Sequence, residues 1–232
     1  MSSEHDKRNT ALHECGHAVN LEVMRGVTQK LGKPWHDAGK VGFITLDPRG
    51  YYGGAVYSND DDNEVGSFER MFGDIVMGFG GCSAENLFMG MQGSIGIGMD
   101  MQMARQTAEY MVTSMGLGAK TGHMTIFEGE DLSEEMKRMI EQDERVILNN
   151  AQLTSDYITE VYSDFNKWFT DKYAKLVGTG DCLIPGDEFR AAFEKWKSEQ
   201  PQDKQAQFRE CEETVMKVIE ATKKGLMVRK RD

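Results

Sequence analysis

The sequence predicts a mainly α-helical fold with one small β-hairpin. Over most of the chain, apolar residues recur three and four positions apart, as they do on one face of a helix. Only residues 41–57 have the composition of short strands separated by a turn. Hydrophobic residues make up 39% and charged residues 28% of the 232 residues, so the composition is that of a globular protein.

The first elements are one helix and the hairpin. Residues 7–25 have helical spacing of small and apolar side chains. Residues 41–46 and 54–57 are expected to form the two strands. The turn residues 47–50, Asp-Pro-Arg-Gly, lie between them.

The rest of the chain is expected to be helical. Residues 68–79 form one helix that Gly80-Gly81 ends or bends, and residues 84–89 continue it briefly. Residues 90–98 hold four glycines and are expected to be irregular. Asp100 then opens a helix that reaches Met115, with Met101 on its packing face. Further helices are expected over 132–149, 153–176 and 187–196, the last starting at Pro185-Gly186.

The domain organisation follows from the end of this pattern. Pro201 closes the packed part, and the residues after it are strongly charged. We therefore expect one domain over residues 1–200 and a charged helical extension over residues 201–232.

Composition and charge exclude several classes of protein. The net charge of −11 argues against nucleic acid as a partner, because phosphate binding requires a basic face. No apolar run approaches the roughly 20 residues that cross a bilayer, and the polar N-terminus does not resemble a signal peptide. The four cysteines have no CxxC spacing or disulfide framework, which predicts a reducing, cytoplasmic location.

One motif indicates chemistry. His13-Glu14-Cys15-Gly16-His17 is H-E-x-x-H. On a helix, residues four apart share a face, so the two imidazoles can hold one zinc ion. Glu14 would lie beside the metal and accept a proton from a bound water, whose pKa zinc lowers to about 7. The competing interpretation is a solvent-facing His-Glu pair on an ordinary helix.

A catalytic zinc site needs a third protein ligand and an open position. His5, His36 and His123 lie in polar or irregular stretches and are expected to be ordinary surface residues. Glu85 and Asp100 stand out, because each is next to a glycine-rich stretch. A carboxylate at a helix start is also a plain cap, so the pattern leaves Asp100 between ligand and cap.

Five stretches, taken in order, resemble the peptidase domain of FtsH-type membrane AAA proteases. Residues 10–19 resemble its zinc helix with H-E-A-G-H-A, and residues 80–85 resemble its G-G-R-x-A-E. Residues 41–57 resemble its strand pair, residues 100–108 its D-L-x-x-A-T helix, and residues 111–117 its M-V-T-x-x-G-M. The resemblance covers roughly residues 7–196.

The resemblance implies a site and partners. In that family the aspartate that opens the D-L-x-x-A helix is the third zinc ligand, which here is Asp100. The edge strand beside the zinc helix pairs with substrate, which points to residues 53–57. The family assembles into rings, so a homo-oligomer is expected, and Glu85 is expected to be structural.

The chain also departs from that family. Cys15 replaces an alanine and is expected to be small and buried, and Cys82 replaces an arginine. The loop before Asp100 differs from the family's T-G-A-x-N. No P-loop, G-x-x-x-x-G-K-[ST], occurs in the 232 residues. A separate AAA ATPase is therefore a possible partner, with Lys223 to Arg231 as a docking segment or an ordinary solvated tail.

The sequence thus predicts a soluble zinc-dependent, ATP-independent endopeptidase that cleaves unfolded or flexible protein. His13, His17 and Asp100 would hold the zinc, and Glu14 would be the general base. The alternative is a catalytically quiet oligomerisation or adaptor protein that works with a separate ATPase.

Overall fold

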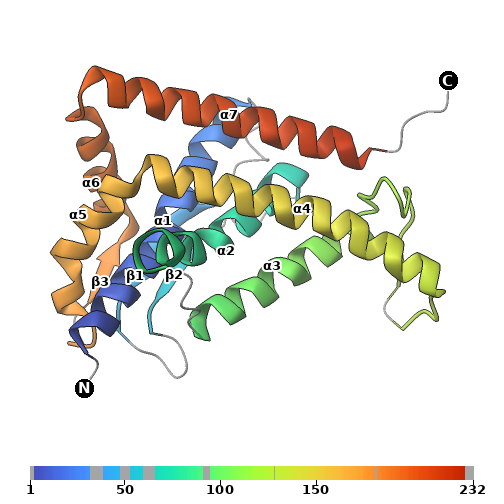
Figure 1. The fold of residues 1–232 in the computed structure, drawn as a ribbon, viewed down its shortest axis with the longest axis horizontal. Helices are drawn as coiled ribbons and strands as arrows, with labels where there is room; N and C mark the ends of the chain where they lie inside the picture. Colours follow the sequence, from blue (N-terminus) through green and yellow to red (C-terminus); the bar gives the residue numbers. More distant parts are fainter. Residues whose placement is uncertain are drawn as a thin grey trace.

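In the computed structural model the described residues are 3–31, 39–47, 53–59, 66–90, 95–127, 129–180 and 182–227. Within them the chain forms seven α-helices, a short 3-10 helix and one small sheet, so the mainly α prediction is confirmed (Figure 1). The helices are α1 (Glu4–Lys30), α2 (Phe68–Met89), α3 (Ile95–Thr113), α4 (Glu134–Val161), α5 (Ser163–Tyr173), η2 (Ala174–Leu176), α6 (Gly186–Ser198) and α7 (Gln202–Leu226).

Serine side chains start three of these helices. Ser3 and Asp6 form a capping box at α1, in which each side chain bonds the other residue's backbone N–H. Ser67 accepts from the Arg70 N–H at 3.2 Å, and Ser133 accepts from the Met136 N–H at 3.2 Å. The caps satisfy N–H groups that have no partner within the helix.

The sheet has three antiparallel strands in the order β2-β1-β3. The expected hairpin is present as β1 (Lys40–Thr45) and β2 (Ala55–Asn59), with Thr45 opposite Ala55. The third strand, β3 (Leu183–Pro185), was not expected, because three residues are too few for a periodic pattern. Within the described residues, β2 is therefore an edge strand.

Helix α1 lies at the centre of the molecule and carries the H-E-x-x-H motif. Its residues 11–24 are buried without exception, because α2, α5, α7 and the sheet contact different sides of it. A helix covered on all sides is buried on its polar face too, which places His13, Glu14 and His17 in the interior. Cys15 is fully buried, as expected.

Helix α2 is continuous through Gly80 and Gly81, so the expectation that the helix ends there is wrong. The glycines permit a close helix crossing instead. A Cβ atom on Gly16 of α1 would lie 2.2 Å from the Gly80 carbonyl oxygen, and one on Gly80 would lie 2.4 Å from the Gly16 carbonyl oxygen. The two backbones therefore touch where α1 and α2 cross.

Helix α3 begins at Ile95, earlier than expected. Residues 95–98 are helical despite two glycines, so the expected irregular stretch is wrong there. Asp100 consequently lies in the second turn of α3 and does not open the helix. Met101, expected on the packing face, is 44% exposed, whereas Ala104, Ala108 and Met111 of the same helix are buried.

The C-terminal helices also differ from expectation. Helix α4 runs unbroken through residues 150–152 and ends at Val161, and α5 follows after Tyr162. The residues after Pro201 are helical, as expected, but α7 packs against α4, and Phe208, Cys211 and Val215 are buried. Pro201 therefore does not close the packed part. The division of the chain at residue 200 stays a prediction.

Some expectations fall on residues outside the described ranges, namely turn residues 48–50, His36, residues 93–94 of the loop before Asp100, and residues 228–231 of the basic end. No helix in the described part of the chain combines the length and the apolarity needed to cross a membrane.

Candidate metal centre

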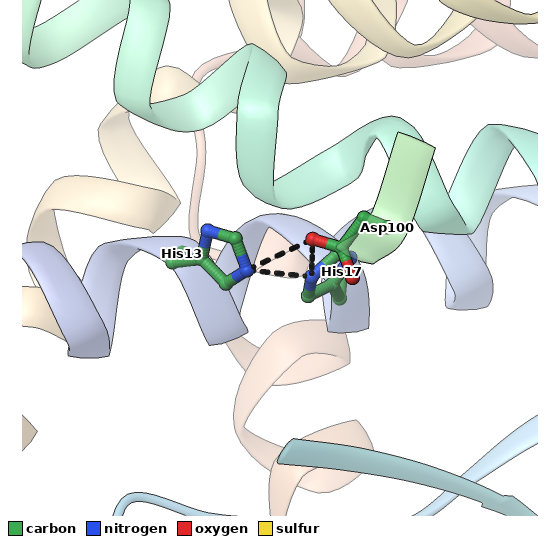
Figure 2. A group of neighbouring side chains, drawn as sticks. All are labelled: His13, His17 and Asp100. Atoms are coloured by element: carbon green, nitrogen blue, oxygen red, sulfur yellow. Dashed lines mark hydrogen bonds and ion pairs between the residues drawn. The ribbon is translucent and has the colours of Figure 1, made fainter. Parts of the chain in front are cut away.

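The two histidines of the motif and Asp100 meet between α1 and α3 (Figure 2). The Nε2 atoms of His13 and His17 are 3.0 Å apart. One carboxylate oxygen of Asp100, Oδ2, lies 3.1 Å from Nε2 of His13 and 3.3 Å from Nε2 of His17. Among the described residues, these three form the group of side chains that could hold a metal ion.

The opposite ring nitrogens of both histidines are already bonded. Nδ1 of His13 lies 2.7 Å from the Glu85 carboxylate, and Nδ1 of His17 lies 2.7 Å from the Met77 carbonyl oxygen. The Gly81 N–H also approaches Nδ1 of His17, at 3.3 Å. The contact of His17 with Met77 is the shorter of the two, and a carbonyl oxygen can only accept, so Nδ1 of His17 is the donor. Nδ1 of His13 likewise faces an acceptor, the Glu85 carboxylate. Both Nε2 atoms are then left with free lone pairs.

Three lone-pair acceptors thus point at one another. Asp100 Oδ2 is buried and has no hydrogen-bond partner despite its closeness to both rings. Such a cluster requires a positive charge at its centre, because buried acceptors facing one another repel. Two imidazole nitrogens and one carboxylate oxygen, with further positions open, are the donor set of a catalytic zinc site.

The pKa values show the same demand for positive charge. Burial alone would lower the pKa of His13, but Asp100, Glu85 and the charge of Glu14 raise it to about 10. Burial would raise the pKa of Asp100, but the contacts with His13 and His17 hold it well below its usual range. The cluster therefore favours a positive charge, and a proton competes with a metal ion for the position between the three side chains.

Glu14 lies beside this cluster, close enough for its charge to affect the pKa of His13. It is 5% exposed and has no hydrogen bond or ion pair with any described residue. Burial raises its pKa, against the opposing effect of His17 and His13. Its Oε1 atom lies 2.8 Å from where a Cβ atom on Gly54 would be, just before strand β2. A buried carboxylate held ready to accept a proton is what a general base requires.

Helix α2 contacts both histidines of the cluster and orients their rings. Glu85 orients the His13 ring, and a Cβ atom on Gly81 would lie 2.5 Å from that ring. Only a glycine therefore leaves room for the ring in this position. The polar backbone and side-chain contacts from α2 fix both histidines in one orientation.

The structure brings together the sequence-predicted residues His13, Glu14, His17 and Asp100. Because Asp100 lies in the second turn of α3, the alternative of a helix cap no longer applies. His5 is exposed in the first turn of α1, and His123 lies after α3 with its ring 3.1 Å from the Gly116 carbonyl oxygen. Neither belongs to the cluster.

Sequence reasoning missed how the histidines are oriented. Glu85 stood out by its position after Gly80-Gly81, but nothing in the sequence indicated that it faces His13. The Met77 contact uses a backbone carbonyl, so no residue type could have indicated it.

Comparison with known proteins gives a consistent family. The sequence profile described as peptidase family M41 matches residues 1–176. The ATP-dependent zinc metalloprotease FtsH of Ruminiclostridium cellulolyticum is 29% identical over 72% of this chain and 28% of its own length. That of Caldicellulosiruptor bescii is 31% identical over 81% of this chain and 30% of its own length.

A plant relative covers more of the chain. The ATP-dependent zinc metalloprotease FTSH 8, chloroplastic, of Arabidopsis thaliana is 26% identical over 89% of this chain and 30% of its own length. The chain thus spans less than a third of the length of each of these three relatives.

Proposed function

The chain belongs to peptidase family M41, and from that premise we propose that it is a zinc-dependent endopeptidase acting on unfolded or flexible polypeptides. The observation that carries the proposal is the buried Glu14 carboxylate beside three converging ligand atoms. His13, His17 and Asp100 would hold the metal, and Glu14 would be the general base. Peptide-bond hydrolysis needs both parts in one place.

The protein's own residues divide the work as follows. Zinc bound at the cluster would supply the Lewis acidity that polarises the peptide carbonyl and acidifies the attacking water. Glu14 accepts the proton of that water and passes it to the leaving amine. Its raised pKa suits this task, because the carboxylate must hold the proton between the two steps. Glu85 keeps the His13 lone pair directed at the cluster.

Substrate would bind as an added strand at β2. The strand is an edge of the sheet within the described residues, and Gly54, just before its first residue, lies against the Glu14 side chain. An extended peptide that pairs with this edge would pass its backbone in front of the general base. This requirement for an extended segment restricts cleavage to unfolded or flexible chains.

The cytoplasm stays the proposed location. All four cysteines are buried and unpaired, as expected in a reducing compartment.

The proposal is tested with the Glu14→Gln variant. The amide keeps the shape of the side chain but cannot accept the proton, so cleavage of an unfolded casein-type substrate should fall by at least about 100-fold. Zinc content, measured by mass spectrometry, and the unfolding temperature should stay near the wild-type values. Glu4→Gln, an exposed change on the same helix, is the matched control and should leave cleavage unchanged.

The same experiment separates the alternative of a quiet adaptor protein. Such a protein would bind zinc or a partner, and its wild-type form would cleave nothing. A Glu14→Gln variant that cleaves at the wild-type rate would show that the peptidase mechanism drawn here is wrong.

A further inference from the structure

Thr10 lies on the same face of α1 as the proposed active-site residues. It precedes His13 by three positions and Glu14 by four, so the side chains lie one above the other. Its side chain is partly buried and contacts the residue before Gly54: Oγ1 lies 3.2 Å from where a Cβ atom on Gly53 would be. Thr10 therefore sits at the start of the edge-strand segment, one helical turn from the general base.

The hydroxyl of Thr10 has no hydrogen-bond partner among the described residues. A helical threonine can bond a carbonyl one turn earlier through its hydroxyl. Six other threonines on the helices do this: Thr28, Thr107, Thr113, Thr154, Thr170 and Thr222. Within the described part of the chain, the Thr10 hydroxyl makes no such bond, and this leaves it open to another molecule there.

The direction of β2 shows where Thr10 lies relative to this strand and Glu14. Val41 of β1 bonds Glu22 of α1, and Ser58 of β2 is paired with Val41. Strand β2 therefore runs alongside α1 from Glu14 towards Glu22. Gly53 and Thr10 lie beyond the start of the strand, on the opposite side of Glu14.

We propose that the Thr10 hydroxyl binds the substrate main chain on the side of the scissile bond away from β2. This inference rests on the proposed peptidase function and extends it. Strand β2 would bind one half of an extended peptide. Thr10 would bind the other half next to Gly53, where no side chain blocks the approach. The two contacts together fix the peptide bond in front of Glu14, which is how a positioned substrate reacts faster.

The test compares Thr10→Val, which keeps the shape and removes the hydroxyl, with Thr10→Ser, which keeps the hydroxyl. Substrates are fluorogenic peptides of one sequence, shortened stepwise from the N-terminal end or from the C-terminal end. On the full-length peptide, Thr10→Val should lower kcat/KM about five-fold, the effect of losing one neutral hydrogen bond, and Thr10→Ser should restore it. In one of the two series, wild type and Thr10→Val should cleave the peptides that are too short to reach Thr10 with equal kcat/KM.

Binding is measured separately, so that failure of cleavage and failure of this inference can be told apart. The full-length peptide is titrated against zinc-loaded Glu14→Gln with and without Thr10→Val, and the double variant should bind about five-fold more weakly. Weaker binding in the double variant supports Thr10 even if wild type cleaves nothing, an outcome that would refute only the peptidase activity. Equal kcat/KM and equal binding would overturn the inference. So would an equal loss on every peptide length, or no binding of any peptide.

Discussion

His17 and Asp100 contribute different atoms to the metal centre, and their loss should have different consequences. His17→Ala removes one of only two nitrogen ligands, so the purified protein should lose its zinc. Asp100→Ala leaves both nitrogens and should weaken zinc binding strongly without abolishing the fold. The wild type should carry about one zinc per chain. Mass spectrometry of the dialysed proteins measures this directly.

His123→Ala is the matched control, because His123 lies outside the cluster and should keep full zinc content. Full zinc occupancy and activity in Asp100→Ala would show that the third ligand is another residue. Glu85 would then be the next candidate, although its carboxylate now faces Nδ1 of His13 rather than Nε2.

The site residues differ in how far the sequence could predict them. His13, Glu14 and His17 follow from local spacing, because a helix fixes which side chains share a face. Asp100 lies more than 80 residues away. Its place after a glycine-rich stretch made it a candidate, and only the resemblance to a known family favoured ligand over cap. The Met77 carbonyl and Gly54 act through backbone position, which depends on how the elements pack.

The crossing of α1 and α2 is the element on which the centre depends. It brings Glu85, Met77 and Gly81 against the two histidines. Gly16→Ala would place a methyl group 2.2 Å from the Gly80 carbonyl oxygen, and the two helices would have to separate. We expect a loss of about 1–3 kcal/mol in the free energy of unfolding, together with weaker zinc binding.

Gly26→Ala is the matched control on the same helix. A Cβ atom at Gly26 meets no atom within 4 Å, so this change should stabilise the protein by about 0.5–1 kcal/mol through helix propensity. Urea unfolding of both variants at saturating zinc gives the comparison. Equal effects of the two substitutions would mean that the close crossing does not limit stability.

The elements that the sequence predicted poorly depend on close packing or on pairing with distant residues. Gly80-Gly81 suggested a break because glycine lowers helix propensity, whereas here it serves close packing inside one helix. Strand β3 has three residues and pairs with a strand about 140 residues earlier, so no local pattern reveals it. Helix α1 and the hairpin were predictable because their periodicity is local and their caps and turns are chemically distinct.

At the scale of the whole molecule, apolar residues remain exposed on α4. Val146 is 40% exposed and Leu153 is 67% exposed, and residues seven apart lie on one face of a helix. We expect this face to contribute to self-association, as the resemblance to a ring-forming family implies. Light scattering at micromolar concentration should show species larger than the 26.1 kDa monomer.

Leu153→Lys should shift that distribution towards the monomer, because a charge on a contact face must be desolvated. Leu183→Lys, at a 54% exposed position on β3, is the control and should leave it unchanged. A monomer alone in the wild type at these concentrations would remove the prediction of self-association.

Cleavage by these 232 residues should be independent of ATP and limited to segments that are already extended. The three relatives are named as ATP-dependent enzymes, and the chain spans less than a third of their length. The 232 residues contain no P-loop. A segment that pairs with the β2 edge must be free of its own structure, and global opening of a stable protein costs about 5–15 kcal/mol.

The purified chain should therefore cleave an unfolded substrate and leave a stably folded one intact, with or without ATP. The experiment uses one substrate protein in two forms: a stable wild type, and a destabilised variant with the same cleavable sequence. Because local sequence is identical, any difference in rate reports the cost of opening. Flexible termini and loops of the folded form should still be cut. If ATP accelerated degradation of the folded core by the purified chain alone, the prediction would be contradicted. The 232 residues themselves would then couple ATP to the opening of the substrate.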